Sequence, residues 1–457
     1  MIPFLSKSGI IYNTMRKERL KEVIKEFQEW NLPNVVPREL NVPLSSRKIV
    51  SIVGPRRSGK TFYLYGLIKK LLSSGVPREE IVFVNFDDPR LLPCDSMCLE
   101  ELLQAYRELY PERIEKTSYL FLDEIQNVKG WEVGVRRLYD TGRFKIYLTG
   151  SSSKLLSREI ASNLRGRGVS FELLPFSLRE ILRAREVKVD KNIAYSTQRA
   201  YVKKLVEEYL ELGGFPEVVL ETDPAMKLRI LREYMETMFI KDLVERYNIR
   251  NSMLLRELVK FLLTNTAKRF SANSFYKWIK TSHPVTKRTL LNYIHHLEDS
   301  GLFFFVRKFA FSLKEQAQAV RKTYVVDVGL RASYGFKFSK DKGTSLENAV
   351  FLEFYRRKTL NPLLEIYYWR DYRGREVDFA VKEGQEVKSL VQVSLDLNNP
   401  KTKQREIAAL LAGSEALNCS QLQIVTLEEE RTEEVGGKTI KITPLWKWLL
   451  SLSDAPA

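Results

Sequence analysis

The sequence contains few residues of the kinds that build metal clusters or disulfide frameworks. Its 457 residues include only three cysteines and three histidines. Cys94 and Cys98 lack the spacing of a zinc knuckle, and no second cysteine pair follows them. We therefore expect the cysteines to be buried or loop thiols in a reducing cytoplasm, and the histidines are too few for a histidine metal cluster.

Long apolar stretches are also missing. Residues 302–306 are typical of the longest strongly apolar runs, and none approaches the roughly 20 residues that span a bilayer. The first residues, MIPFLSKSGIIYN, lack the sustained apolar stretch of a signal peptide. We expect a cytoplasmic protein with no membrane partner.

The charge of the chain is basic and unevenly distributed. Hydrophobic residues make up 44% and charged residues 29%, which is typical of folded domains, and the length predicts two to four of them. Lys plus Arg exceeds Asp plus Glu by 74 − 57 = 17. Residues 254–345 alone hold 17 basic and 6 acidic residues, an excess of 11. Such a segment favours an anionic partner.

A glycine-rich loop follows the first apolar strand. Residues 48–53 have the composition of a buried strand, GPRRSGKT comes next, and an apolar helix follows over 61–72. Glycines let the backbone amides of such a loop point at phosphate, and the helix directs its positive end at the same anion. This P-loop pattern predicts bound ATP. The expected nucleotide contacts are Gly54, Pro55, Arg56, Arg57, Ser58, Gly59, Lys60, Thr61 and Phe62.

Two acids end a later strand. Residues 81–86 and 119–122 are apolar, and Asp123 and Glu124 follow the second run. With Lys60 neutralising phosphate charge, Thr61 and Asp123 are expected to hold the Mg²⁺ that accompanies ATP. Glu124 would act as the general base on the attacking water. The alternative is a solvated acidic strand end.

Polar residues after a fourth strand complete this edge of the sheet. Thr149 and Ser151 follow the strand expected over 145–148 and suit a γ-phosphate sensor, although this cluster is also suited to capping a helix. One strand between the P-loop strand and the Asp123 strand would be typical of additional-strand ATPases, which include AAA+ proteins. Arg165 and Arg167 precede the strand at 169–173 and are candidates for an arginine finger in an oligomer, or for a solvated basic loop.

Several motifs make the chain recognisable. After a helical pattern over 177–250, interrupted by GGFPE, the order GPRRSGKT, FLDEIQNV, LTGSSSKLLS, LRGR, LPFSLREIL, GGFPEVV and FIKDLVERYNI is complete. It resembles a prokaryotic and archaeal AAA+-like ATPase family with a winged-helix module and a fused C-terminal restriction-endonuclease-like domain. The resemblance covers nearly the whole chain and implies the same nucleotide site: Lys60, Thr61, Asp123 and Glu124.

The basic middle segment has the pattern of three helices, at 253–265, 271–280 and 284–298, followed by two strands. It resembles the family's winged helix, whose third helix enters the DNA major groove. The expected DNA contacts are Lys277, Lys280, Thr286, Lys287, Arg288, Asn292, Arg307, Lys308, Lys314, Arg321 and Lys322. The alternative is a winged helix that binds protein and whose charges are only solvated.

The last segment resembles the PD-(D/E)XK nuclease fold. Glu347 and Asp378 match its first two acidic positions, but the final motif contains Gln392 and Ser394, so a carboxylate and the lysine are missing. A neutral amide is a poor Mg²⁺ ligand. We expect a degenerate nuclease fold that serves as a scaffold or DNA clamp.

The predicted architecture is α/β: a P-loop ATPase sheet with a helical lid, a winged helix and a nuclease-like α/β domain. The expected boundaries are an N-terminal arm at 1–46, the ATPase core at 47–176, the lid at 177–250, the winged helix at 251–338 and the nuclease-like domain at 339–457. The predicted function is ATP hydrolysis by a homo-oligomer that acts on branched or duplex DNA. The alternatives are a nucleotide-gated switch that binds protein partners, and an ATP-dependent defence nuclease.

Overall fold

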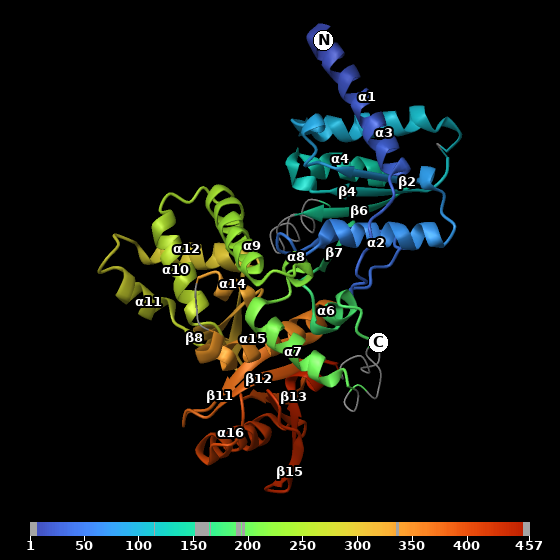
Figure 1. Ribbon diagram of the computed structural model, residues 1–457. Helices are drawn as coiled ribbons and strands as arrows, with labels where there is room; N and C mark the ends of the chain where they lie inside the picture. The colour runs from blue at the N-terminus through green and yellow to red at the C-terminus, as the bar shows by residue number, and fades with distance from the viewer. Residues whose placement is uncertain are drawn as a thin grey trace. The chain divides into compact units, whose positions relative to one another are not determined.

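The chain folds into two compact units, Met1–Leu173 and Leu174–Ala457. The computed structural model, drawn in Figure 1, describes residues 7–113, 115–150, 164, 166–188, 193, 197–334 and 338–450. Each unit is built on its own main sheet.

The first unit contains a parallel five-stranded sheet in the order β2-β4-β6-β1-β7. Its strands are β1 (Ile49–Val53), β2 (Ile81–Asn85), β4 (Ser118–Asp123), β6 (Phe144–Gly150) and β7 (Gly168–Glu172). A two-stranded pair, β3 (Cys94–Asp95) with β5 (Val128–Lys129), lies outside this sheet. The order places β6 between β1 and β4, which confirms the expected intervening strand. The register pairs Val53 of β1 with Gly150 and Glu172, so the ends of β1, β6 and β7 meet at one edge.

Helices cover both faces of this sheet (Figure 1). One apolar core contains residues of α1 (Lys7–Glu29), α3 (Ser96–Leu109) and α4 (Trp131–Asp140), together with alternate strand residues such as Val84 and Leu122. The other contains α2 (Lys60–Ser73) with the residues between them, such as Phe83 and Phe121. Because successive side chains of a strand point to opposite faces, these apolar strands are buried on both sides.

The expected N-terminal arm is part of the ATPase unit. Leu20 and Ile24 of α1 are fully buried in the core that contains α3. The Arg16 guanidinium forms a buried ion pair with Glu101 of α3, and its Nη2 lies 2.8 Å from Oε1. The segment after α1 also packs inward, since Leu40 and Val42 join the core against α2.

The cysteine expectation is wrong for two of the three residues. Cys94 and Cys98 form a disulfide that joins β3 to the first turn of α3. Their separation of four residues brings the Cα atoms to 5.7 Å where the chain turns from strand to helix, within the range that a disulfide needs. Cys419 is a buried free thiol, as expected.

The second unit begins with helices. They are α6 (Leu178–Ala184), α7 (Arg199–Leu212), α8 (Pro216–Leu220), α9 (Pro224–Thr237), a π-helix (Met238–Glu245), α10 (Ser252–Thr264), α11 (Ala272–Ile279), α12 (Lys287–Asp299), α13 (Leu313–Gln318) and α14 (Gly329–Ala332). Ser177 starts α6 with a capping box, in which its side chain and that of Glu180 exchange hydrogen bonds with the backbone. Helices therefore occupy the range expected for the lid.

A buried carboxylate holds the GGFP segment that separates α7 from α8. Asp327 accepts hydrogen bonds from the amides of Gly214 (2.7 Å) and Gly329 (2.8 Å). Gly213 has φ +75°, and a Cβ there would lie 1.7 Å from Asp327 Oδ1, so no larger residue fits. Burial raises the pKa of Asp327 to about 7 despite these two bonds.

The second unit also contains a nine-stranded sheet, in the order β15-β16-β14-β13-β12-β11-β9-β10-β8. Its strands are β8 (Arg269–Phe270), β9 (Phe303–Lys308), β10 (Arg321–Val325), β11 (Leu364–Arg370), β12 (Glu376–Glu383), β13 (Glu386–Val393), β14 (Leu422–Thr426), β15 (Arg431–Val435) and β16 (Lys438–Pro444). The helices α15 (Phe338–Leu360), α16 (Pro400–Leu417) and α17 (Leu445–Leu450) accompany it.

Strands from the middle segment and the C-terminal segment share this sheet. β9 pairs in parallel with β11 through Arg307 with Tyr367 and Lys308 with Tyr368. The amide of Phe309 adds a hydrogen bond of 2.7 Å to the carbonyl of Tyr368. The predicted boundary at 338–339 therefore falls between segments whose strands are hydrogen-bonded to each other, and the finer division of the chain stays a prediction.

Candidate functional site

The loop after β1 has the backbone geometry of an anion cradle. Gly54 has φ +153°, Arg57 φ +65° and Gly59 φ +90°, so three of its six residues up to Gly59 adopt positive φ. A Cβ on Gly54 would lie 2.2 Å from the carbonyl oxygen of Leu173, which makes glycine obligatory where the loop passes β7. Such curling directs successive backbone N–H groups to one side, as phosphate binding needs.

The side chain of Lys60, the first residue of α2, folds back onto this loop. It is 5% exposed, and its ammonium donates to the carbonyls of Gly54 (3.2 Å) and Pro55 (3.0 Å). Arg38, from the segment after α1, donates from Nη1 to the carbonyl of Ser58 at 2.9 Å and so supports the loop from outside. No local spacing in the sequence indicates the Arg38 contact, because 20 residues separate the two partners.

Asp123 joins the loop to the neighbouring strands. Thr61 Oγ1, in the first turn of α2, donates to Asp123 Oδ2 at 2.8 Å, and the Thr149 hydroxyl donates to Oδ1. Asp123 is fully buried. Burial raises its pKa to about 6, although the hydrogen bonds from Thr149 and Thr61 lower it. The predicted metal pair, Thr61 and Asp123, is therefore in direct contact.

Glu124 is held next to this pair. It has φ +52°, which turns the chain sharply after β4, and its amide donates to Thr149 Oγ1 at 3.0 Å. Its carboxylate accepts a hydrogen bond from the side-chain amide of Gln126. The sequence motifs did not predict this contact of Gln126, although Gln126 lies only two residues after Glu124.

Thr149 occupies the predicted sensor position at the end of β6. The strand runs to Gly150, two residues beyond the expected end, so Thr149 is paired with Ile52 of β1 and is fully buried. One hydroxyl thus contacts both the Asp123 carboxylate and the Glu124 backbone. The second sensor candidate, Ser151, lies outside the described residues.

Of the two finger candidates, only Arg167 is described, because Arg165 lies outside the described residues. Arg167 Nε lies 3.0 Å from Asp140 Oδ1, and the guanidinium lies 6.0 Å from the centre of the Tyr139 ring. It precedes β7 at the end of the sheet opposite to the loop, since Gly168 pairs with Ile49. Arg167 therefore cannot contact the nucleotide site of its own subunit.

The predicted DNA contacts of α11 and α12 are exposed. Thr286 caps α12 by accepting from the amide of Thr289 at 3.1 Å. Within the described part of the chain, no acidic side chain forms an ion pair with these cations. The exposed residues are Lys277, Lys280, Thr286, Lys287, Arg288 and Asn292.

The contacts predicted for the wing differ from one another. Arg307 and Lys314 are exposed, Lys308 pairs with Glu315 at 2.7 Å, and Arg321 lies 3.6 Å from Glu298. The prediction for Lys322 is wrong, because its side chain is 3% exposed. It faces inward on β10, where period-two alternation places it on the same side as the buried Tyr324.

Lys322 lies among the acids of the C-terminal segment. Its ammonium is 2.7 Å from Asp378 Oδ1, 3.1 Å from Glu347 Oε1 and 3.1 Å from Glu376 Oε1. The structure therefore brings Glu347 and Asp378 together as predicted. It adds Glu376 and Lys322, which sequence reasoning missed at this position.

Gln392 also reaches this cluster, but through the backbone. Its Oε1 accepts from the amide of Asp378 at 2.6 Å, and its Nε2 donates to the carbonyl of Glu376 at 3.0 Å and to the Glu406 carboxylate. No group of three or more His, Cys, Asp or Glu side chains in the described ranges is arranged to hold a metal ion.

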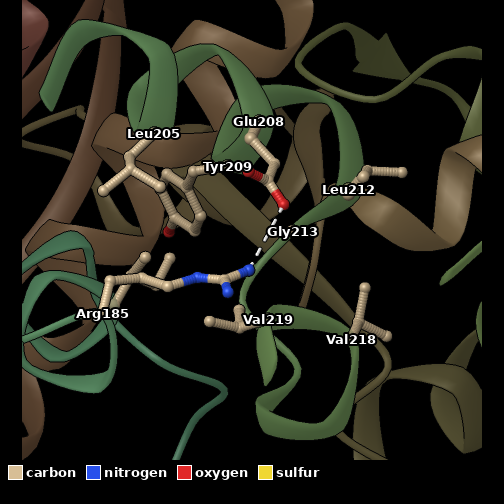
Figure 2. A pocket seen from close by; sticks show the side chains of 9 residues that line it. Arg185, Leu205, Glu208, Tyr209, Leu212, Gly213, Val218 and Val219 are labelled. Carbon is tan, nitrogen blue, oxygen red and sulfur yellow. Dashed lines mark ion pairs between the residues drawn. The ribbon is translucent and has the colours of Figure 1, made fainter. Parts of the chain in front are cut away.

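A small cavity lies between α6, α7 and α8 of the second unit (Figure 2). Figure 2 shows Arg185 extended towards Glu208, and their nearest charged atoms are 3.9 Å apart. The volume of about 10 Å³ is enough for about one water molecule. This cavity is too small for a nucleotide or another organic ligand.

Three family models match successive parts of the chain. A model described as an AAA domain matches residues 46–182. Two models described as domains of unknown function, DUF8612 and DUF4143, match residues 203–341 and 342–448. Among the described helices, none is both long enough and apolar enough to cross a bilayer.

Relatives match most of the chain. The uncharacterized protein MJ1544 of Methanocaldococcus jannaschii is 36% identical over 425 residues, which cover 91% of each chain. An uncharacterized protein of Haemophilus influenzae is 29% identical over 77% of this chain and 82% of its own. A solved structure, the Walker-type ATPase PABY2304 of Pyrococcus abyssi, is similar with a TM-score of 0.42 and 14% identity, covering 74% of this chain and 99% of that one.

Proposed function

We propose that this chain, which belongs with the Methanocaldococcus jannaschii protein to an AAA+-like P-loop ATPase family, binds and hydrolyses ATP in order to act on DNA. The observation that carries the ATPase proposal is the contact of 2.8 Å between Thr61 Oγ1 and Asp123 Oδ2. It brings the start of the phosphate-binding helix to the acidic end of β4, and the next acid along the chain is Glu124.

The groups around Asp123 suit a divalent cation bound with the nucleotide. A threonine hydroxyl and a buried carboxylate are hard oxygen ligands of the kind that Mg²⁺ takes in P-loop ATPases. Burial raises the pKa of Asp123 to about 6, and a cation bound beside it would favour the charged form of this carboxylate. Mg²⁺ bound there would neutralise charge on the β- and γ-phosphates.

The other residues of the site have separate tasks. Lys60 would exchange its two loop carbonyls for phosphate oxygens, since both partners are neutral acceptors. Glu124 would accept a proton from the attacking water, and the Gln126 amide would keep its carboxylate oriented until then. Thr149 couples Asp123 to the backbone of Glu124 and would keep the two acids in register.

The middle segment supports DNA as the second partner. The order α10, β8, α11, α12, β9, α13, β10 is consistent with a winged helix that carries a short helix between its last two strands, and α12 would then be the recognition helix. Residues 258–297 contain seven Lys or Arg and no Asp or Glu. The exposed N-terminal turn of α12, with Thr286, Lys287 and Arg288, would face the duplex, and phosphate contacts there would be strongly salt-dependent.

A homo-oligomer would give Arg167 a role at a neighbouring site. The ion pair between Arg167 and Asp140 leaves both side chains partly exposed, at 32% and 50%, so the arginine could exchange partners. The C-terminal segment, with α15 followed by β11, β12 and β13, would be a nuclease-like fold that serves as a scaffold rather than a catalyst. Mg²⁺- or Mn²⁺-dependent nicking that is lost on Asp378→Ala would contradict this part of the proposal.

The decisive experiment measures ATP hydrolysis with and without forked DNA. Lys60→Ala should abolish turnover, whereas Lys70→Ala, on the exposed side of the same helix, should leave it unchanged. DNA should stimulate the wild type, and the stimulation should weaken as salt rises. A slow rate that DNA does not change would favour the alternative, a nucleotide-gated switch for protein partners.

A further inference from the structure

Lys322 is surrounded by carboxylates in the way that a bound cation is. An ammonium group carries three N–H donors, and three carboxylates from two elements lie within 3.1 Å of this one. Glu347 comes from α15, while Glu376 and Asp378 come from neighbouring inward positions of β12. The ammonium of Lys322 donates hydrogen bonds to Asp378 and Glu347, and Glu376 adds an ion pair.

Other protein donors also contact the carboxylates of the cluster. Asp378 Oδ2 accepts from the amide of Val393 at 2.9 Å, and Glu347 Oε1 accepts from the Tyr324 hydroxyl at 2.8 Å. The side-chain oxygen of Gln392 accepts from the backbone of Asp378. One oxygen of Asp378 and one oxygen of Glu347 therefore accept from protein groups other than Lys322, which fixes the orientation of both carboxylates around the ammonium.

The formal charges of the cluster balance without a metal ion. Counted as ionised groups, Glu347, Glu376 and Asp378 contribute three negative charges, and Lys322 contributes one positive charge. Two arginines supply the rest: Arg269 Nε lies 3.4 Å and Arg370 Nε 3.8 Å from Glu376 Oε2. Burial and the charge of Asp378 raise the pKa of Glu347 to about 7, so protonation of this carboxyl would only reduce the negative charge. Burial alone would lower the pKa of Lys322, but attraction to Asp378 and Glu347 raises it well above its ordinary value, so the ammonium stays charged.

We propose that Lys322 is a built-in cation, whose ammonium takes the place of a divalent metal ion between Glu347, Glu376 and Asp378. Lys322 therefore does not act as a catalytic replacement for the lysine that is missing at position 394. The ammonium of Lys322, from the middle segment, instead occupies the space between the three carboxylates and links β10 to the C-terminal segment. This inference is independent of the proposed action on ATP and DNA.

The test uses Mn²⁺ as the probe on the full chain without nucleotide, with bound ion counted by electron paramagnetic resonance. Mn²⁺ bound by the wild type should be unchanged by Asp378→Asn and by Glu347→Gln. The Lys322→Ala variant should gain one Mn²⁺ site that Asp378→Asn removes, and Mn²⁺ should raise its Tm. Lys382→Ala, on the same strand as Asp378 and paired with Glu365 at 2.8 Å, should gain no site.

Two results would overturn the proposal. One is Mn²⁺ bound by the wild type and lost on either acidic substitution, since the site would then be open with Lys322 in place. The other is a folded Lys322→Ala protein that gains no site. The comparison of the wild type with Asp378→Asn and Glu347→Gln needs no substitution of Lys322. It can therefore overturn the proposal even if the Lys322→Ala variant does not fold.

Discussion

Gly54→Ala is the substitution that tests the shape of the phosphate-binding loop most directly. The added Cβ would lie 2.2 Å from the Leu173 carbonyl oxygen, whereas Cβ atoms essentially never lie closer than 3.0 Å to such an atom. The loop or β7 must therefore shift by about 0.8 Å (3.0 − 2.2). No side chain can move aside to relieve this clash, because the two nearest atoms, the carbonyl oxygen and carbon of Leu173, belong to the backbone.

A shift of that size should be costly for catalysis. Misplacing a reacting group by about 1 Å lowers turnover by roughly 100-fold. Gly54→Ala should therefore reduce ATP turnover by about that factor and weaken nucleotide binding, because the amides that face the phosphates move with the loop.

Gly75→Ala is the matched control. Gly75 also has positive φ, +89°, but nothing lies within 4 Å of the position of its Cβ. It should reproduce the backbone strain of an alanine at positive φ without the clash, and so lower the Tm while leaving turnover intact. If Gly54→Ala hydrolysed ATP within about threefold of the Gly75→Ala rate, the clash would not govern the site, and our account of the loop would be wrong.

Three further substitutions examine other parts of the chain. Thr149→Val keeps the shape but removes the hydroxyl that contacts Asp123, so turnover should fall about tenfold, as for the loss of one hydrogen bond of roughly 1.4 kcal/mol, with little change in nucleotide affinity. The pKa of Asp327 is higher in the folded chain, about 7, than its ordinary 3.8, so the folded state holds an extra proton between these values. The stability of the wild type relative to Asp327→Asn should therefore fall by about 2.5 kcal/mol between about pH 5 and pH 8 in urea unfolding, and an unchanged difference would contradict the burial argument. Lys287→Ala should weaken duplex binding and reduce the slope of log affinity against log salt by about 0.9, whereas Lys388→Ala, paired with Glu386 on β13, should change neither.

The nucleotide site could be predicted because its parts are local motifs at the ends of neighbouring strands. GPRRSGKT and the acids after 119–122 are each contiguous, and parallel strands bring their carboxyl ends to one edge. The contact between Thr61 and Asp123 therefore followed from sequence order alone. The contacts that escaped prediction, Arg38 with Ser58 and Arg16 with Glu101, join residues 20 and 85 positions apart. No local spacing marks such pairs, because they depend on how α1 and the segment after it pack on the sheet.

The disulfide was missed for a different reason. The spacing of Cys94 and Cys98 excludes a zinc site but does not address a disulfide, because the spacing rules of zinc sites concern two pairs of cysteines. Their actual proximity comes from a change of structure between them, since a two-residue strand gives way to a helix capped by Asp95. Asp95 accepts from the amide of Met97 at 3.1 Å, a capping pattern that is readable in the sequence. That cap would have placed the second cysteine in the first turn and brought the sulfurs together.

Lys322 shows why a missing motif residue has to be sought on neighbouring strands. The absence of lysine at position 394 indicates a lost charge only if the C-terminal segment completes its own sheet. In the structure β11 continues through β9 to β10, so a strand more than 50 residues before Asp378 contributes to the same face. The alternation in RKTYV was the available signal, because it puts Lys322 on the side of Tyr324, and a buried tyrosine predicts a buried neighbour two residues away. A lysine in that place needs acids around it to remain charged, and in the structure Glu347, Glu376 and Asp378 supply them.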